Sequence, residues 1–502
     1  MIDPRTPVVV GVGQLNQRTE PGDARSPVGL FVDAARLADT DAGGGVLRRV
    51  DTVAVVQIGS WGYHDPGAVA ARELGIEPRS TIVSTVGGNS PQLLVNEMAA
   101  SIRRGERDCV LLGGGEVMNT RRRARKAGID LCWEMPDDPP CPIVIGDDGA
   151  GTNETENAHG ATAPVFVYPL LETALRARAA RSVAEHQRFV GELWSTFAAV
   201  AAENPYAWSR TAFTPEQIAT AAPDNRMVTF PYTKRMMAHI DVDQAAAVLL
   251  CAYETARAAG VADDRMVFLH SGADAHDHWF LTDRHSLSES VAIGEVTRAA
   301  LTAAGLGVDD VARFDFYSCF PAAVELAMGS VGLAGPGGGD PRPLTVTGGL
   351  CFAGGPLNNY PTHAIARMAE LLRADPGSYG LTTALGWYAT KHSCGVWSTT
   401  PPPAGFVRVD PATTQAAVDA TPRRTGAATH SGPITVEATS VPFDRAGAPL
   451  HAIVAGLTSD GRRTFATTSD PDAMRSITTE GWEGRTAEVV TDGTTNTVTK
   501  VH

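Results

Sequence analysis

An internal repeat constrains the fold of this chain more than any other feature of its sequence. Residues 50–78 and 308–336 each contain a short apolar run, a polar turn and an alanine-rich helical pattern. Residues 79–115 and 342–386 follow in the same order, each with an apolar run, a Gly-Gly turn, a helical pattern and a second apolar run. Strands that alternate with helices predict a parallel α/β sheet. Their recurrence predicts two copies of one α/β unit, packed as a pseudo-dimer.

The segment between the two copies differs from both of them. Residues 119–236 begin with a basic run, continue through a proline-rich stretch and contain two helix-like segments. An insertion of this length is typical of a cap or loop domain. After it, the sequence "IDVDQAAAVLLCAYETARAAG" at residues 240–260 predicts a core helix that ends at Gly260.

The last part of the chain predicts a separate small domain. It is rich in Thr, Asp and Gly, and short runs of alternating polarity surround one helical pattern, "DPDAMRSI". Five short strands with one helix predict a β-barrel of the oligonucleotide/oligosaccharide-binding type. The predicted domains are residues 1–118 with 237–275, the loop domain 119–236, the second half 276–408 and the C-terminal domain 409–502.

Composition excludes several classes of partner. The chain has 502 residues, too many for one core, and a net charge of −14 at pH 7, which disfavours nucleic acids and membrane surfaces. The first residues show no signal-peptide pattern, and no apolar run is long enough to insert into a membrane. The seven cysteines are scattered without a CxxC pair, which favours reduced thiols and a cytoplasmic location.

Several sequence blocks between about residues 5 and 400 resemble the thiolase superfamily. "DCVLLGGGEVMN" is similar to the block in which two glycines precede Glu-Ser-Met-Ser, and "GGLCFAGGP" is similar to the block that ends in Gly-His-Pro. The stretch from "NPYAWSRTAFTPEQI" to "DVDQAAAVLLC" looks like the sterol-carrier-protein type of thiolase. The shared order of these blocks identifies the chain as a thiolase-like protein with an additional C-terminal domain.

The resemblance carries implications for fold, ligand and assembly. It implies a duplicated thiolase fold, with two βαβαβαββ halves in α/β/α/β/α layers. It also implies acyltransferase chemistry of lipid metabolism, of the acetyl-CoA acetyltransferase kind, with coenzyme A or acyl-CoA as ligand and no bound cofactor. Thiolases of this superfamily form homodimers, although the extra domain makes a monomer an alternative.

The resemblance also places the thiolase catalytic positions on residues that cannot do the chemistry. The thiolase nucleophile is a cysteine whose pKa is lowered by a helix N-terminus, and this position is Gly88 here. The histidine of Gly-His-Pro falls on Gly355, and the second cysteine falls on Leu385. The block that helps to form the oxyanion hole falls on Tyr317, Ser318, Cys319 and Phe320. We therefore expect a degenerate site that binds a thioester through helix N-terminal amides without thiolase turnover.

Two alternatives to this expectation stay open. Cys319, or His392 and Cys394 on one face of a predicted hairpin, could supply a new base and thiol to an active acyltransferase. Inert packing of a buried thiol and a solvated turn are the simpler explanations of these residues. His363 lies on the predicted helix after Gly355, and packing or surface exposure explains it more simply than catalysis. In the second alternative the chain is a non-catalytic assembly partner that acts through its C-terminal domain.

Two charged segments raise further possibilities. Arg121, Arg122 and Arg123 open the inserted segment and could bind the phosphates of coenzyme A, because arginine forks match phosphate oxygens. A solvated helix face is the competing explanation. Asp274, His276 and His278 have a spacing that can bind zinc. A loop at the junction of the two halves explains them more simply, so we expect no metal site.

Overall fold

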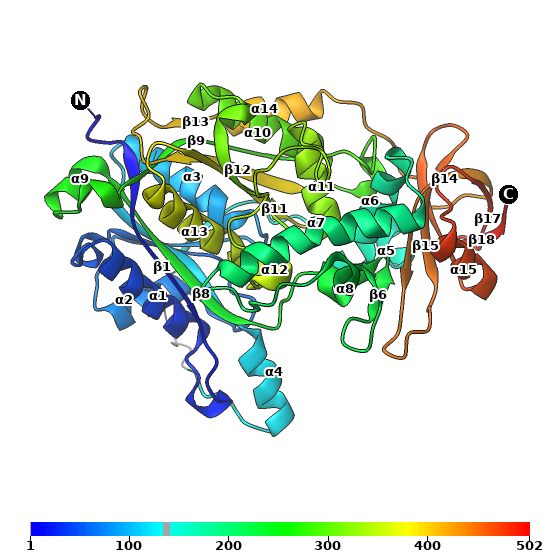
Figure 1. Ribbon diagram of the computed structural model, residues 1–502, viewed down its shortest axis with the longest axis horizontal. Coiled ribbons are helices and arrows are strands. Elements are labelled where there is room, and N and C mark those ends of the chain that lie inside the picture. The colour runs from blue at the N-terminus through cyan, green and yellow to red at the C-terminus, as the bar shows by residue number, and fades with distance from the viewer. Residues whose placement is uncertain (1, 134–140) are drawn as a thin grey trace.

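The structure is a computed structural model that describes residues 2–133 and 141–502. Its main sheet has eleven strands and runs through both copies of the repeat (Figure 1). The first copy contributes β1 (Pro7–Asn16), β2 (Thr52–Val55), β3 (Ser80–Ser84), β4 (Cys109–Val117) and β8 (Asp243–Ala252). The second copy contributes β9 (Val267–His276), β10 (Val311–Asp315), β11 (Tyr379–Gly386) and β12 (Lys391–Ser398). No helix of the described part is long and apolar enough to cross a membrane.

The strand order confirms the duplication. The first copy contains the order β2-β4-β8-β1, and the second contains β10-β11-β12-β9. In both, the first pair is parallel and the next two pairs are antiparallel. A short antiparallel contact between β1 and β9 joins the copies. The strands that both copies contain therefore occupy equivalent places in the two halves, whereas residues 342–348, which pair with β3 in the sequence repeat, form no strand.

Helices cover both faces of the strands and complete the expected layers. The helices of the two copies are α1 (Pro27–Asp41), α2 (Pro66–Leu74) and α3 (Ser90–Arg103), and α10 (Val291–Ala304), α11 (Pro321–Ser330) and α13 (Tyr360–Ala374). Helices α3 and α13 contact each other and strands of both copies, so they form the middle layer (Figure 1). Helix α1 packs on β1 and β8 from outside, and α10 packs on β9 and β12. The α/β/α/β/α arrangement is therefore confirmed.

The close packing of α1 on β1 explains two glycines of the first strand. A β-carbon added to Gly11 would lie 2.1 Å from the carbonyl oxygen of Ala38, and one added to Gly13 would lie 2.0 Å from that of Ala34. Any larger side chain at these positions would push the helix away from the sheet. The glycines of "GVGQ" thus permit helix–sheet contact.

The predicted core helix at residues 240–260 is wrong. The structure has the strand β8 over Asp243–Ala252, and only a short helix, α9 (Tyr253–Ala258), follows it. Every residue of β8 is buried, because helices cover both faces of this strand. A strand buried on both sides needs no alternation of polarity, and its apolar run resembles that of a buried helix.

The inserted segment forms a mainly helical layer beside the second copy. Its elements are α4 (Met118–Ala127), β5 (Ile143–Ile145), α5 (Glu154–Ala158), α6 (Pro164–Arg178), α7 (Val183–Glu203), α8 (Pro215–Ala219), β6 (Met227–Phe230) and β7 (Tyr232–Thr233). Ser182 and Thr214 begin α7 and α8 with capping boxes, in which the side chain and a Glu or Gln three residues later satisfy backbone donors. Strand β5 adds to the edge of the main sheet by parallel pairing with β3.

The C-terminal segment forms the expected barrel. After α14 (Pro411–Asp419), its elements are β14 (Gly432–Pro442), β15 (Ala452–Thr458), β16 (Arg463–Thr468), α15 (Pro471–Thr479), β17 (Thr486–Thr491) and β18 (Asn496–Val501). The strands close in the order β14-β15-β16-β18-β17-β14. This closed barrel is confirmed, and β14 also pairs with β6 of the inserted segment. It lies at one end of the molecule, beside α6 (Figure 1).

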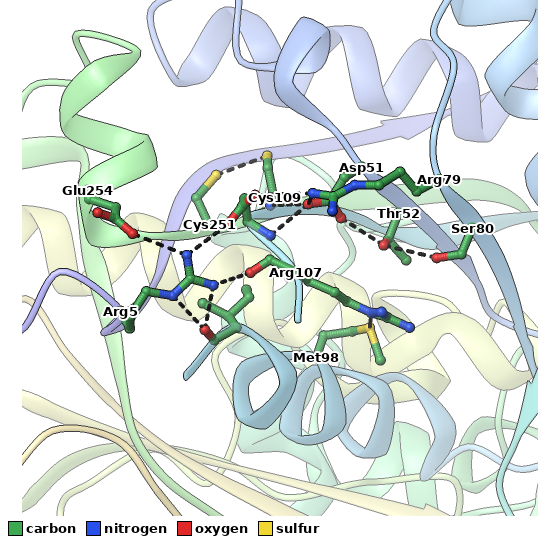
Figure 2. Close-up of polar contacts among 12 residues, drawn as sticks. Arg5, Asp51, Thr52, Arg79, Ser80, Met98, Arg107, Cys109, Cys251 and Glu254 are labelled. Atoms are coloured by element: carbon green, nitrogen blue, oxygen red, sulfur yellow. Dashed lines mark hydrogen bonds and ion pairs between the residues drawn. The ribbon is translucent and has the colours of Figure 1, made fainter. Parts of the chain in front are cut away.

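Polar side chains fix the ends of the strands in the first copy (Figure 2). The buried carboxylate of Asp51 accepts hydrogen bonds from the backbone N–H groups of Asp108 (2.6 Å) and Cys109 (3.3 Å) and from the guanidinium of Arg79 (3.1 Å). Cys109 lies opposite Cys251 on β8, with 3.1 Å between the two sulfur atoms. All seven cysteines are free thiols.

Candidate functional site

The first Gly-Gly turn, before α3, is joined by a hydrogen bond to the segment that follows the second Gly-Gly turn. The backbone N–H of Gly87 donates a hydrogen bond of 3.0 Å to Oδ1 of Asn358, which follows the second turn. The amide nitrogen of Asn358 donates to the carbonyl of Gln57 at 2.9 Å. We call the turn at residues 85–89, with the groups that face it, the helix-mouth site.

Gly88 has no room for a side chain. A β-carbon added there would lie 2.2 Å from the hydroxyl oxygen of Tyr317 and 2.5 Å from the carbonyl oxygen of Leu385. The structure thus brings together three positions that the resemblance assigned to the thiolase centre. The phenol of Tyr317 stands where a nucleophile side chain at position 88 would have to be.

Gly355 has a different environment from Gly88. A β-carbon added there would lie 3.5 Å from both the β-carbon of Ala238 and the carbonyl oxygen of His239. The N–H of Gly355 donates to the same carbonyl at 3.0 Å. The neighbouring Gly354 has a φ of +113°, and a β-carbon there would lie 2.1 Å from Oε1 of Gln244. The second turn is therefore held against the segment that leads into β8.

Lys391 belongs to the helix-mouth site, although sequence reasoning placed it in a solvated turn. Its buried ammonium donates hydrogen bonds to the carbonyls of Val86 (2.6 Å) and Asp147 (3.0 Å). Burial lowers the pKa of Lys391, and Asp147 and Asp148 oppose this shift. Alternation along β12 places Lys391 on the face opposite to His392, but the sequence pattern does not show which of the two faces meets the site.

His392 and Cys394 share a face of β12, but that face lies against α10. The Nε2 atom of His392 is 3.5 Å from a carboxylate oxygen of Asp277 and 3.1 Å from the carbonyl of Ala389. Cys394 is fully buried, and its burial raises the pKa of the thiol. The structure does not bring these two side chains to the helix-mouth site.

The block at residues 317–320 is buried throughout. Burial raises the pKa of Cys319 to about 12, so its thiol stays protonated at neutral pH. The hydroxyl of Ser318 accepts a hydrogen bond of 3.3 Å from the N–H of Leu350. The N–H of Tyr317 donates to the hydroxyl of Thr383 at 3.0 Å. Unlike a catalytic cysteine, whose pKa is lowered, Cys319 is not activated.

His363 and the residues whose spacing resembles a zinc site, Asp274, His276 and His278, lie in separate surroundings. His363 is buried and lies 3.0 Å from Oε1 of Gln14, and burial lowers its pKa to about 3. Asp274 pairs with Arg408 at 3.0 Å. The ring of His276 contacts the carbonyl of Asp277, and the ring of His278 contacts the hydroxyl of Thr421.

The basic run forms α4, which projects from the body of the molecule (Figure 1). Arg122 pairs with Asp241 at 2.7 Å, and Arg123 pairs with Glu20 at 2.7 Å. Arg121 is exposed and has no ion pair within the described ranges. Acidic neighbours therefore pair with two of the three arginines for which phosphate binding and a solvated helix face were the two interpretations.

Comparison with known proteins confirms the thiolase resemblance. A family model described as the thiolase-like protein type 1 additional C-terminal domain matches residues 413–494. The crystal structure of a monomeric SCP2-thiolase like protein type 1 from Mycobacterium smegmatis is 34% identical, with a TM-score of 0.85, and the match covers 99% of this chain and 100% of that one. No curated protein matches the chain.

Two thiolase-fold structures are similar in fold alone. The dimeric peroxisomal thiolase of Saccharomyces cerevisiae is 13% identical, with a TM-score of 0.55, over 79% of this chain and 98% of that one. An acetyl-CoA acetyltransferase from Syntrophomonas wolfei is 14% identical, also with a TM-score of 0.55, over 80% of this chain and 100% of that one. Both matches leave about a fifth of this chain uncovered.

Proposed function

The chain belongs to the family of SCP2-thiolase-like proteins of type 1, and we propose that it binds acyl-CoA or a related lipid thioester without thiolase turnover. The observation that carries the absence of turnover is the filled space at Gly88, where the hydroxyl of Tyr317 and the carbonyl of Leu385 leave no place for a nucleophile. The protein is then a pseudoenzyme of lipid metabolism.

Polar groups around the helix-mouth site support ligand binding. The hydroxyl of Thr85 and Oδ1 of Asn89 are buried and have no hydrogen-bond partner in the part of the chain that the structure describes. Buried polar atoms without partners are costly, and polar atoms of a bound ligand would satisfy them. The N-terminus of α3, which begins at Ser90, favours an oxygen that carries negative charge, such as a polarised thioester carbonyl.

Acyl transfer by replacement residues has less support than binding. The thiols of Cys319 and Cys394 have raised pKa values, whereas a nucleophile needs a thiolate. His392 contacts Asp277 on the α10 side of the sheet. An assembly role of the C-terminal barrel is a further possibility, although β14 already uses one edge to pair with β6 of the same chain.

Calorimetric titration with coenzyme A and a short acyl-CoA, beside a thiolysis assay with acetoacetyl-CoA, tests the proposal. We expect acyl-CoA binding and no thiolysis. Gly88→Ala should weaken binding, because its methyl group displaces Tyr317 at the helix mouth. Gly62→Ala is the matched control, because a β-carbon there meets no atom within 4 Å. Thiolysis with a kcat above about 1 per second, or no acyl-CoA binding, would contradict the proposal.

A further inference from the structure

A second cluster of reactive side chains lies away from the helix mouth, where three helices meet. Glu172 is on α6, His186 on α7 and Glu325 on α11, and all three side chains are buried. One donor atom from each lies within 4.8 Å of the others. Helices α6 and α7 belong to the inserted segment, and α11 belongs to the second copy. The cluster therefore bridges two parts of the molecule.

The donor atoms are close to the spacing that a metal ion requires. Nε2 of His186 is 2.6 Å from Oε1 of Glu172 and 3.8 Å from Oε1 of Glu325. In a tetrahedral zinc site with bonds of about 2.1 Å, the ligand atoms stand about 3.4 Å apart. The two observed distances fall on either side of this value. Small side-chain movements would therefore place all three atoms around one ion.

One donor of the cluster is buried without a partner. Oε1 of Glu325 makes no hydrogen bond with any described residue, although the side chain is only 8% exposed. A buried carboxylate oxygen that faces a histidine nitrogen and lacks a donor is costly. The carboxylate is aimed into the cluster and is available to a cation.

Neighbouring side chains orient two members of the cluster. The hydroxyl of Tyr232 donates to Oε2 of Glu172 at 2.5 Å, which orients this carboxylate and leaves its other oxygen toward His186. Arg181 lies 3.4 Å from Nδ1 of His186 and 3.6 Å from Glu325. Its guanidinium also stacks on the ring of Phe189 at 3.5 Å. A neutral His186 that binds an ion through Nε2 carries its proton on Nδ1, so the guanidinium of Arg181, which only donates, must move away from Nδ1 when the ion binds.

We propose that Glu172, His186 and Glu325 bind a divalent transition-metal ion, and that Zn²⁺ fits this set of one nitrogen and two oxygen donors. Glu325 and Arg181 line a cavity of about 570 Å³ between α6, α7, α10 and α11, which gives the ion a route from solvent. Three protein donors leave a fourth position for water or a small oxygen ligand. The ion would tie the inserted segment to the second copy, independently of thioester binding.

The test is a titration of the full chain with Zn²⁺, followed by calorimetry, and a parallel titration with Co²⁺, followed by visible spectroscopy. Cys132 and Cys141 are exposed thiols and should be replaced by serine, because they can bind these ions nonspecifically. We expect one bound equivalent, cobalt d–d bands without thiolate charge transfer, and a higher melting temperature in the presence of the ion.

Glu325→Gln and His186→Ala should each lower the affinity at least tenfold and abolish the rise in melting temperature. Glu325→Gln keeps the shape of the side chain, so it protects the test against a misfolded His186→Ala chain. His64→Ala, which removes an exposed histidine, should bind as the parent does. The site is disproved if the parent binds no ion, or if Glu325→Gln binds as tightly as His64→Ala.

Discussion

Single residues decide what the helix-mouth site can do, and Gly88 is the clearest example. Gly88→Cys should not restore thiolysis, because the new side chain meets the hydroxyl of Tyr317 and the carbonyl of Leu385. Overpacking of this kind lowers the free energy of unfolding by roughly 1–3 kcal/mol. Urea unfolding and a thiolysis assay measure the two effects, with Gly62→Ala as the control. A Gly88→Cys chain as stable as the parent would show that the helix mouth is looser than the structure indicates.

Glu116 gives the protein a dependence of stability on pH. Its buried carboxylate accepts hydrogen bonds from the N–H groups of Gly59 (2.7 Å) and Ser60 (2.8 Å), and burial raises its pKa from 4.5 to about 7. The folded state therefore holds a proton that the unfolded state has lost between these two values. The free energy of unfolding should fall by about 3 kcal/mol as the pH rises through this window.

Urea unfolding at pH 5 and pH 8 measures this contribution of Glu116. Glu116→Gln should show a smaller fall than the parent, because its amide does not titrate. It will also be less stable at low pH, since one of the two backbone donors loses its acceptor. An equal pH dependence in the parent and in Glu116→Gln would assign the effect to other groups.

The sequence predicted some site residues and missed others for a physical reason. Gly88, Tyr317 and Leu385 could be placed together because each lies in a motif with a fixed order. Lys391 was missed because alternation along a strand separates two faces without showing which one meets the site. Glu172, His186 and Glu325 lie on helices far apart in the sequence, and only tertiary packing brings them within 4.8 Å.

At the scale of elements, Asp51 fixes the start of β4 against its neighbours (Figure 2). Asp51→Ala leaves the N–H groups of Asp108 and Cys109 and the guanidinium of Arg79 without this acceptor. We expect the free energy of unfolding to fall by roughly 2–3 kcal/mol, measured by urea unfolding. The control is Asp264→Ala, which removes an exposed aspartate. Equal stability of the two variants would contradict a structural role for Asp51.

Sequence patterns identified some of these helices and strands correctly and misidentified others. The two helix-like patterns of the inserted segment were predicted and form α7 and α8, and the structure adds that Ser182 and Thr214 cap their first turns. Strand β8 was mistaken for a helix because both of its faces are covered, so its alanines carry no period that distinguishes the two. Helical periodicity was informative on partly exposed helices, whereas burial of a strand on both sides removed the pattern that distinguishes it from a helix.

At the scale of the whole molecule, Arg463 joins the barrel to the second copy. Its fully buried guanidinium binds the carboxylate of Glu437 at 2.7 and 3.1 Å and the carbonyl of Leu281 at 2.5 Å. Arg463→Ala leaves a carboxylate without its partner and should lower the free energy of unfolding by about 3–5 kcal/mol. Thermal and urea unfolding measure the loss, with the exposed pair residue Arg462 changed to alanine as the control. Similar losses in both variants would contradict this role.

The overall architecture was more predictable than the contacts between its parts. Duplication, the inserted segment and the barrel followed from repeats and changes of composition. The pairing of β1 with β9 and of β14 with β6 did not, because each contact joins segments that are distant in the sequence. Such contacts depend on backbone edges, which carry no side-chain signature.

Strand β5 occupies the edge of the main sheet beside β3, where Ile82 pairs with Ile143 and Ser84 with Ile145. A strand from another molecule could add to that edge of β3 only by displacing β5. Because β5 is tethered to the same chain, its effective concentration at the edge is high even in dilute protein. The inserted segment thus acts as a built-in competitor of strand exchange between molecules.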